Sequence, residues 1–271
     1  MLPSVQKCFC SRRNMCERTE EEWRPALFHR VESHRERFLA AARRLLDLQA
    51  ASIWSDIAPV LKTASGAVLD VGCGAQPYRC LLPEGITYTG IDIVDVKQRF
   101  GYEMPDTLYY RGDSWPIANL SFSMILCTET LEHVSNPSFF LSEAYRVLNP
   151  GGTLVLTVPF AARWHFIPYD YWRFTPSSLK HFLEQAGFRN VAVYARGDAL
   201  TVACHKMMAL PLSLLFRKSS GPISNCIFRL LGIALLPLLG FFAIIGHVSL
   251  RTTRGGDDCL GYTVFAEKGD E

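Results

Sequence analysis

The segment that most constrains the fold is an apolar run that leads straight into a glycine turn at residues 68–78. It reads Val-Leu-Asp-Val-Gly-Cys-Gly-Ala-Gln-Pro-Tyr. The apolar part predicts a buried strand. Glycine permits positive φ and close backbone approach, so main-chain N–H groups can bind an anionic ligand. A dinucleotide-binding turn looks similar, but here Gln76 and Pro77 stand in place of the third glycine, and Asp70 precedes the turn.

From residue 67 onward, apolar runs alternate with helix-like stretches. The predicted strands are 67–71, 88–93, a short strand before residue 111, 123–127, 153–158, 191–195 and a last strand at 261–266. Predicted helices at 136–148 and 176–186 end at glycine turns, 149–152 and Gly187. This alternation predicts an open, mostly parallel α/β sheet.

Polar residues follow the predicted strands at their carboxyl ends, where open α/β sheets bind ligands. Asp92 ends the second strand, twenty positions after Gly72, where a carboxylate can bind both ribose hydroxyls. Asp113 and Ser114 follow the third strand, beside Trp115, and suit the edge and face of an adenine ring. The fourth strand ends in Thr-Glu-Thr-Leu-Glu-His-Val at 128–134, which opens into the same site.

Taken together, these motifs resemble those of class I S-adenosylmethionine (SAM)-dependent methyltransferases. The resemblance covers about residues 65–195 and includes Leu-Asp-Val-Gly-Cys-Gly, Gly-Ile-Asp, Gly-Asp and Leu-Asn-Pro-Gly-Gly-Thr-Leu. It implies a Rossmann-like, doubly wound sheet of seven strands with an antiparallel last strand, and SAM as cofactor. The residues it assigns to the cofactor are Asp70, Gly72, Cys73, Gly74, Asp92, Ile93, Asp113, Ser114, Thr128 and Glu129, with Glu129 near the sulfonium. One departure is Ser-Phe-Ser at 121–123, where many relatives have aspartates around the phenylalanine.

Acceptor specificity is predicted to lie in the aromatic-rich loop 159–175, which follows the fifth strand. Its pattern His-x-x-Pro-x-Asp-x-Trp-Arg-x-Thr resembles small-molecule methyltransferases associated with glycan and lipid-linked saccharide pathways. His165 or Asp170 is a candidate base for a hydroxyl acceptor. Equally, Asp170 and Arg173 can pair to fix the loop while Thr175 caps the next helix. Residues expected to contact the acceptor are Glu129, His133, Trp164, Tyr171, Trp172 and Arg173, although His133 better fits a structural role at a helix start.

Residues 199–256 form a predicted apolar, basic helical insertion before the last strand. This stretch has no acidic residue, and its basic residues are Lys206, Arg217, Lys218, Arg229, Arg251 and Arg254. Such a composition suits an anionic membrane surface. A single crossing would separate the last strand from its sheet, so an interfacial or re-entrant hairpin is favoured over a buried dimer interface. Oligomerisation through the insertion stays open.

Composition bounds the remaining possibilities. The domain organisation expected over 271 residues is a weakly ordered arm (1–20), a helical cover (21–62) containing an amphipathic helix at 21–48, and a methyltransferase domain (63–198 and 257–271). A net charge of +2 gives no signal for nucleic acid. Nine scattered cysteines favour a reducing compartment, and Cys8, Cys10 and Cys16 lack an obvious fourth ligand, so no metal is predicted.

Location and activity leave alternatives open. The N-terminal residues lack the apolar core of a secretory signal, so a cytoplasmic protein, peripheral or monotopic on the inner face of the membrane, is expected. The leading hypothesis is methyl transfer to a small or lipid-linked acceptor, through a hydroxyl group, at a membrane surface. Alternatives are a catalytically silent SAM-binding scaffold of a membrane complex and an NAD-dependent oxidoreductase.

Overall fold

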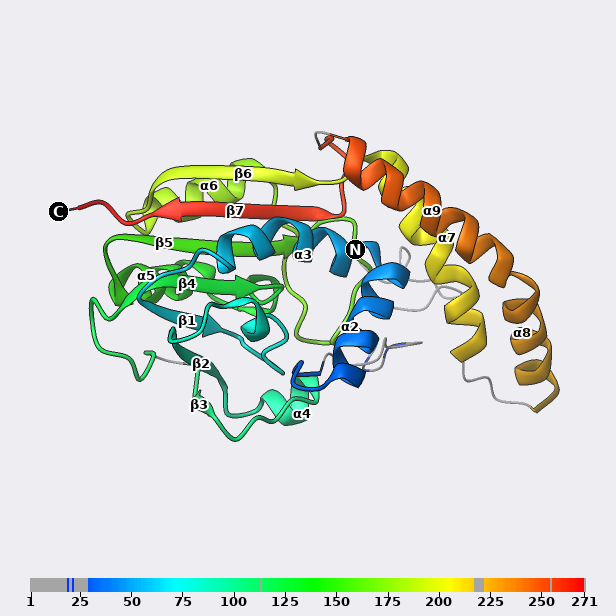
Figure 1. The fold of residues 1–271 in the computed structure, drawn as a ribbon, viewed down its shortest axis with the longest axis horizontal. Coiled ribbons are helices and arrows are strands. Elements are labelled where there is room, and N and C mark those ends of the chain that lie inside the picture. The colour runs from blue at the N-terminus through cyan, green and yellow to red at the C-terminus, as the bar shows by residue number, and fades with distance from the viewer. Residues whose placement is uncertain are drawn as a thin grey trace, which may run out of the picture.

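The computed structural model describes residues 19, 21, 29–112, 114–216, 222–253 and 255–270 (Figure 1). Its centre is a seven-stranded sheet in the order β3-β2-β1-β4-β5-β7-β6. The strands are β1 (Ala67–Val71), β2 (Thr87–Ile93), β3 (Thr107–Tyr110), β4 (Phe122–Thr128), β5 (Leu148–Pro159), β6 (Arg189–Arg196) and β7 (Gly261–Glu267). Only β7 runs antiparallel to its neighbours, β5 and β6. The predicted Rossmann-like sheet is therefore confirmed.

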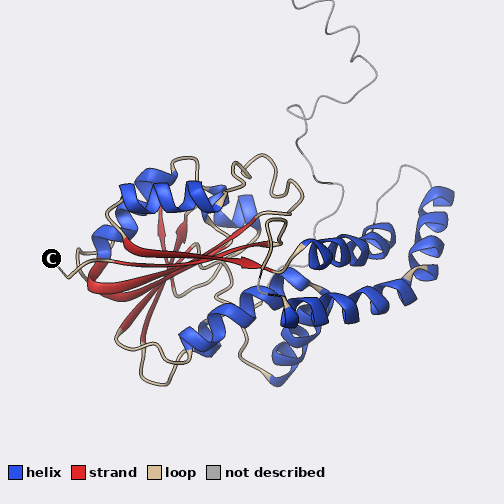
Figure 2. Cartoon of the chain, turned by 90° about the horizontal axis from the view of Figure 1, so that it is seen from above, coloured by secondary structure: helices blue, strands red, loops and turns tan. Residues whose placement is uncertain are grey.

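Helices cover both faces of the sheet (Figure 2). On one face, α5 (Pro137–Val147) and α6 (Pro176–Gln185) pack on a core that includes Ile125, Cys127 and Leu156. On the other face, α3 (Leu48–Leu61) packs on Leu126 and Val155. Successive residues of β4 and β5 thus point to opposite faces, as the two-residue period of a strand requires. Being buried on both sides explains why these strands are continuous apolar runs.

The N-terminal helix is shorter than predicted and is broken. Residues 29–33 are not helical, residues 22–28 lie outside the described part, and α2 (His34–Leu46) ends at Asp47. Asp47 has extended backbone angles and accepts hydrogen bonds from the N–H groups of Gln49 and Ala50, so it caps the next helix, α3. No residue of α2 is buried, and Phe38 is 72% exposed. The prediction that 21–48 is one covering helix is therefore wrong: α3 is the cover, and α2 leaves its apolar side chains exposed.

The strand and helix boundaries elsewhere lie close to the predicted ones. The largest difference is at 149–152, predicted as a turn between helix and strand. β5 instead begins at Leu148, directly after α5, and the extra residues form an irregularity in its pairing with β4 between Phe122 and Met124. Gly151 has φ of +71° and donates its N–H to the carbonyl oxygen of Lys268, the residue that follows β7. This segment is therefore fixed to the chain beyond β7 and is not a free turn. Short elements complete the domain: η2 (Arg79–Leu81), α4 (Val96–Phe100) and η3 (Leu131–His133).

The insertion consists of α7 (Ala199–Phe216), α8 (Pro222–Ala234) and α9 (Leu236–Thr252) and projects from one end of the sheet (Figure 1). α7 and α9 pack side by side through small and apolar residues, Cys204 and Met208 against Ala243, with Leu48 of α3 beneath. A Cβ added at Gly246 would lie 2.4 Å from Leu48 Cδ1, so glycine is needed where α9 crosses α3. The root of the hairpin is thus docked on the domain that contains the sheet.

Candidate active site

The glycine turn after β1 adopts the conformation that the sequence required. Gly72 and Gly74 have φ of +68° and +49°. A Cβ added at Gly72 would lie 2.3 Å from Thr130 Cγ2, so no side chain fits there. The third glycine of a dinucleotide turn is replaced by Gln76, which itself has φ of +54° and is fully buried. Its amide nitrogen donates to Asp106 Oδ1 and Thr107 Oγ1, both at 3.1 Å, and these bonds fix the turn against the start of β3.

Two buried carboxylates lie beside this turn. Asp92, 8% exposed, accepts hydrogen bonds from the N–H of Gly74 at 3.0 Å and of Ile93 at 2.8 Å. Burial raises the pKa of Asp92 to about 6, although both hydrogen bonds act in the opposite direction. Asp70 lies deeper: it accepts a hydrogen bond from Tyr88 Oη at 2.8 Å, and burial raises its pKa to about 7. Asp92 is thus positioned by the turn, whereas Asp70 is a buried support for the β1–β2 pair.

The other residues predicted to contact SAM differ in burial and in position. Cys73 is buried, with Sγ 3.5 Å from Thr107 Oγ1, so it packs under the turn. Ile93 is half-buried, and Ser114 is exposed. Asp113 lies outside the described residues. The assignment of these residues to SAM therefore stays a prediction.

The end of β4 contains an ion pair that the sequence did not predict. Glu129 has φ of +48°, and its N–H bonds to Thr157 O at 3.0 Å, directly after Thr128. Its carboxylate accepts a hydrogen bond from Arg196 Nη2 at 2.8 Å. Arg196 is fully buried at the end of β6 and also donates to Val158 O at 3.0 Å. The only sign of this contact in the sequence is Arg196 itself, an arginine directly after the predicted strand 191–195.

The loop between β5 and α6 is organised around Asp170. Its carboxylate, with 0% side-chain exposure, accepts hydrogen bonds from both terminal nitrogens of Arg173, at 2.6 and 2.7 Å, and from the N–H of His165 at 3.0 Å. His165 Nδ1 is 2.9 Å from Asp170 Oδ2. Although burial opposes the shift, the hydrogen bonds from Arg173 and His165 lower the pKa of Asp170. The predicted Asp170–Arg173 pair is confirmed, and so is the capping of α6 by Thr175.

This arrangement separates the two candidate bases. A carboxylate with a lowered pKa and fully occupied oxygens is a weak proton acceptor. His165 has 20% side-chain exposure, and its Nδ1 lies 3.0 Å from its hydrogen-bond partner Arg163 O and 2.9 Å from Asp170 Oδ2, which leaves Nε2 as the nitrogen that can accept a proton. Of the two side chains, only His165 keeps a free proton-accepting atom, and its role as a base stays a prediction.

The loop is tied back to the end of β4 through η3. Tyr171 N and Trp172 N donate to Glu132 O, Trp172 Nε1 donates to Val134 O, and His133 Nδ1 is 2.8 Å from Tyr169 O. His133 is the last residue of η3, and whether its role is structural stays a prediction. Burial and the neighbouring His165 lower the pKa of His133 to about 4. Burial and the nearby Glu129 raise the pKa of Glu132 well above its usual value.

Four of the predicted acceptor residues lie on this loop, and they differ in solvent exposure. Trp164 and Arg173 are half-buried, whereas Tyr171 and Trp172 are 49% and 37% exposed. Sequence reasoning missed Glu21, whose carboxylate is 4% exposed, accepts a hydrogen bond from Phe166 N at 2.8 Å and pairs with Arg163 at 2.9 Å. A residue predicted to start the N-terminal covering helix therefore holds the loop in place.

Known proteins resemble the chain across this domain. Residues 31–193 match the family model of a methyltransferase domain. A ubiquinone biosynthesis O-methyltransferase of Xanthomonas oryzae is 36% identical over 112 residues, 36% of this chain and 44% of that protein, so the match spans less than half of that relative. A demethylmenaquinone methyltransferase of Tropheryma whipplei is 30% identical over 185 residues, 55% of this chain and 77% of that protein. A SAM-dependent methyltransferase from Archaeoglobus fulgidus shares the fold, with a TM-score of 0.50, 18% identity and coverage of 85% of this chain and 99% of that one.

The described residues suit the cofactor of this family. At Gly72 there is no room for a side chain, Gly74 has a positive φ, and Asp92, next to the end of β2, has its carboxylate held in place by main-chain N–H groups. Gly72 and Gly74 would pass under the methionine part and Asp92 would hold the ribose hydroxyls. The chain belongs to the class I S-adenosylmethionine-dependent methyltransferases.

Proposed function

We propose that the chain transfers a methyl group from SAM to a hydroxyl group of a small or lipid-linked acceptor at a membrane surface. The observation that carries this proposal is that the ligand-binding edge of the sheet and the apolar insertion share one end of the molecule (Figure 1). Both β5 and β6 are antiparallel to β7, so β6 ends at the same edge as β1 and β4, and α7 begins three residues after it. An acceptor held by the insertion would thus lie beside the cofactor.

The insertion presents an apolar surface to its surroundings. Phe241, Ile244 and Val248 of α9 are 56%, 70% and 55% exposed. Large apolar residues of α7 and α8 and the α8–α9 junction are exposed as well, namely Leu200, Met207, Leu210, Phe216, Ile227, Leu230, Leu231, Ile233, Leu236 and Leu238. Exposed large apolar side chains in this number on three adjoining helices are typical of a contact with membrane or protein. The basic residues Arg229 and Arg251 are exposed on the same helices, which favours an anionic membrane.

Helix lengths and connectivity restrict how the insertion can meet a bilayer. Within the described ranges, α7 is the one helix long and apolar enough to cross, and α8 and α9 together form a pair bent by 46°. Eighteen residues of α7 span about 27 Å, close to the ~30 Å hydrocarbon core. Gly256 N donates to Gly197 O at 3.1 Å, so the chain returns to where it left. This supports a hairpin that lies in the interface or enters and returns.

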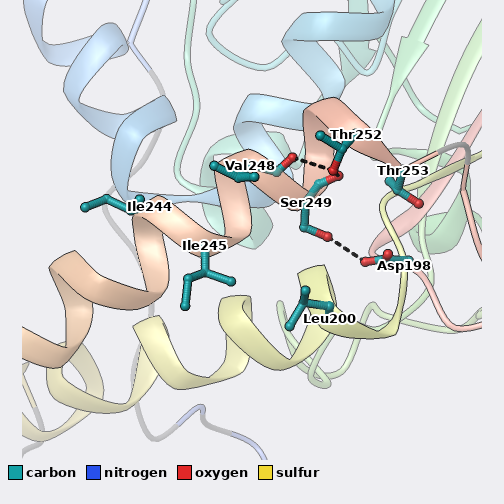
Figure 3. A pocket seen from close by; sticks show the side chains of 8 residues that line it. All are labelled: Asp198, Leu200, Ile244, Ile245, Val248, Ser249, Thr252 and Thr253. Carbon is teal, nitrogen blue, oxygen red and sulfur yellow. Dashed lines mark hydrogen bonds between the residues drawn. The ribbon is translucent and has the colours of Figure 1, made fainter.

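The root of the hairpin is polar and locked (Figure 3). Asp198 accepts hydrogen bonds from the N–H and hydroxyl of Thr201 and from Ser249 Oγ, the last at 2.8 Å. Beside it lies a pocket of about 390 Å³, lined by Asp198, Ser249, Thr252 and Thr253 and by apolar residues of α7 and α9. A fixed root would hold the insertion at a constant orientation to the active-site edge.

In methyl transfer the protein mainly has to align the acceptor with the methyl group and remove the acceptor proton. When bound, SAM supplies an electrophilic methyl group on a sulfonium. The glycine turn and Asp92 would hold SAM, and the loop 159–175 would hold the acceptor. His165 Nε2 would take the hydroxyl proton while Asp170 stabilises the protonated imidazole. A hydroxyl acceptor is also supported by the O-methyltransferase named among the relatives.

The catalytic part is tested by replacing His165 and Asp170 separately. His165→Asn is expected to lose turnover with SAM affinity unchanged, and Asp170→Asn to shift the pH profile of turnover. The matched control is His181→Asn, an exposed histidine on α6. Unchanged turnover in His165→Asn would overturn the assignment of the base. A chain that binds SAM but labels no product from a membrane lipid extract would instead be a silent scaffold.

The membrane part is tested by flotation with anionic vesicles. Ile244→Glu places a charge on the most exposed apolar position of α9 and is expected to abolish vesicle binding without changing SAM affinity. Leu108→Glu serves as control, because Leu108 is also exposed, at 47%, but lies on the edge strand β3. If the wild type remains with the soluble fraction and forms dimers that Ile244→Glu disrupts, the insertion is a protein interface and the membrane proposal fails.

A further inference from the structure

We propose that Glu132, His133 and His165 form a binding site for a divalent transition-metal ion. The three side chains come from two segments, η3 and the loop after β5, that the fold brings together at the carboxyl end of the sheet. One ligand atom from each lies within 4.8 Å of the others. The sequence did not group these residues, because more than thirty positions separate His133 from His165.

Both imidazoles are already oriented as metal ligands are. His133 Nδ1 is 2.8 Å from Tyr169 O, and His165 Nδ1 is 2.9 Å from Asp170 Oδ2. A metal-binding histidine normally donates its other N–H to a carbonyl or carboxylate, which fixes the ring and raises the basicity of the ligand nitrogen. These contacts leave Nε2 of each ring for the ion. The two rings lie edge to face, 5.0 Å apart.

Glu132 supplies the second, independent observation. Its side chain is fully buried, and within the part of the chain that the structure describes neither carboxylate oxygen has a hydrogen-bond partner. The nearest cationic candidate is His133 Nε2, 3.7 Å from Oε1, beyond hydrogen-bond distance. The guanidinium of Arg173 is hydrogen-bonded to Asp170. Arg196 reaches Glu129 through Nη2 alone, and its Nε and Nη1 are themselves buried without a hydrogen-bond partner among the described residues. A buried carboxylate without a partner is strongly unfavourable, and a bound cation would satisfy it.

The ligand set indicates the class of ion. Two imidazole nitrogens and one carboxylate suit Zn²⁺, Fe²⁺ or Mn²⁺, whereas Mg²⁺ and Ca²⁺ prefer oxygen ligands. Three protein ligands leave a coordination position open, as in catalytic rather than structural zinc sites. An acceptor hydroxyl bound there would lose its proton more readily because the cation lowers its pKa. His165 would then act as a ligand in place of its role as base, and the hydroxyl, made more acidic by the ion, would release its proton to solvent water.

The site is tested with Co²⁺, whose visible absorption reports on coordination, added to the full-length chain without SAM or acceptor. One tightly bound ion per chain is expected, competed by Zn²⁺ but not by Mg²⁺. Glu132→Gln and His165→Asn are each expected to weaken binding at least about tenfold. The matched controls Glu184→Gln and His181→Asn replace exposed residues of α6 and should leave it unchanged.

Folding of each variant is checked by SAM affinity and by the thermal midpoint in the absence of metal. If folded Glu132→Gln and His165→Asn bind Co²⁺ as the wild type does, the site is wrong. A thiolate-to-cobalt charge-transfer band as the only signal would assign the ion to cysteines and would also overturn the proposal. Because the readout involves no turnover, failure of the metal site leaves the proposed methyl transfer standing.

Discussion

Acidification below pH 6 is expected to weaken SAM binding through Asp92. This carboxyl is 8% exposed, and burial raises its pKa to about 6 against the hydrogen bonds from Gly74 and Ile93. Only the ionised form offers full charge to the ribose hydroxyls. With that pKa the ionised fraction falls from about nine-tenths at pH 7 to about one-tenth at pH 5, so the dissociation constant rises about tenfold, or ~1.4 kcal/mol.

Isothermal titration of SAM between pH 5 and 8 measures this effect, with Asp92→Asn as the variant in which the dependence should vanish. Loss of folding is not the expected cause. The pKa values of Asp92 and Asp70 are raised in the folded state, so these carboxyls bind more protons there than in the unfolded chain, and their contribution to stability increases as the pH falls from 7 to 5. The reasoning is refuted if wild-type affinity is the same at pH 7 and 5, or if Asp92→Asn loses affinity equally.

Three further substitutions follow from the contacts. Gly72→Ala puts a Cβ 2.3 Å from Thr130 Cγ2 and strains a left-handed residue by about 1–2 kcal/mol; calorimetry should show a lower thermal midpoint and SAM titration a loss above tenfold. Arg173→Ala leaves the buried carboxylate of Asp170 without its main partner. Because Arg173 is half-buried, we expect a loss of about 1–3 kcal/mol in chemical unfolding, and no measurable loss would contradict the role of this pair in the loop. Asp198→Ala removes the acceptor at the root of the hairpin; hydrogen exchange should increase at the start of α7 and the end of α9 while SAM affinity stays constant.

The sheet was predictable because each of its strands has a strong local pattern. β1 was predicted at its observed bounds, and the cofactor turn followed from glycines whose positive φ no other residue adopts easily. The break in the N-terminal helix was not predicted, since the apolar periodicity continues through Asp47 and only the capping geometry shows that the residue starts a new helix.

The partners of the site were less accessible to sequence reasoning. Arg196 meets Glu129, and His133 lies beside His165, only because β4, β5 and β6 end at one edge of the sheet. Such contacts depend on strand order, which local patterns do not encode. Glu21 was predicted only as the first residue of a covering helix for the same reason: its partners lie more than 140 positions along the chain.

The return of the chain at Gly197 and Gly256 has a consequence for how this enzyme could have diversified. Because β7 is held along its whole length by β5 and β6, the sheet does not depend on what connects β6 to β7. Closing a longer or shorter connection there costs little entropy, about 0.6 kcal/mol for each doubling of length. The hairpin is therefore an exchangeable module, and related enzymes could acquire, lose or replace it, and with it their acceptor range, while the cofactor-binding half of the molecule stays as it is.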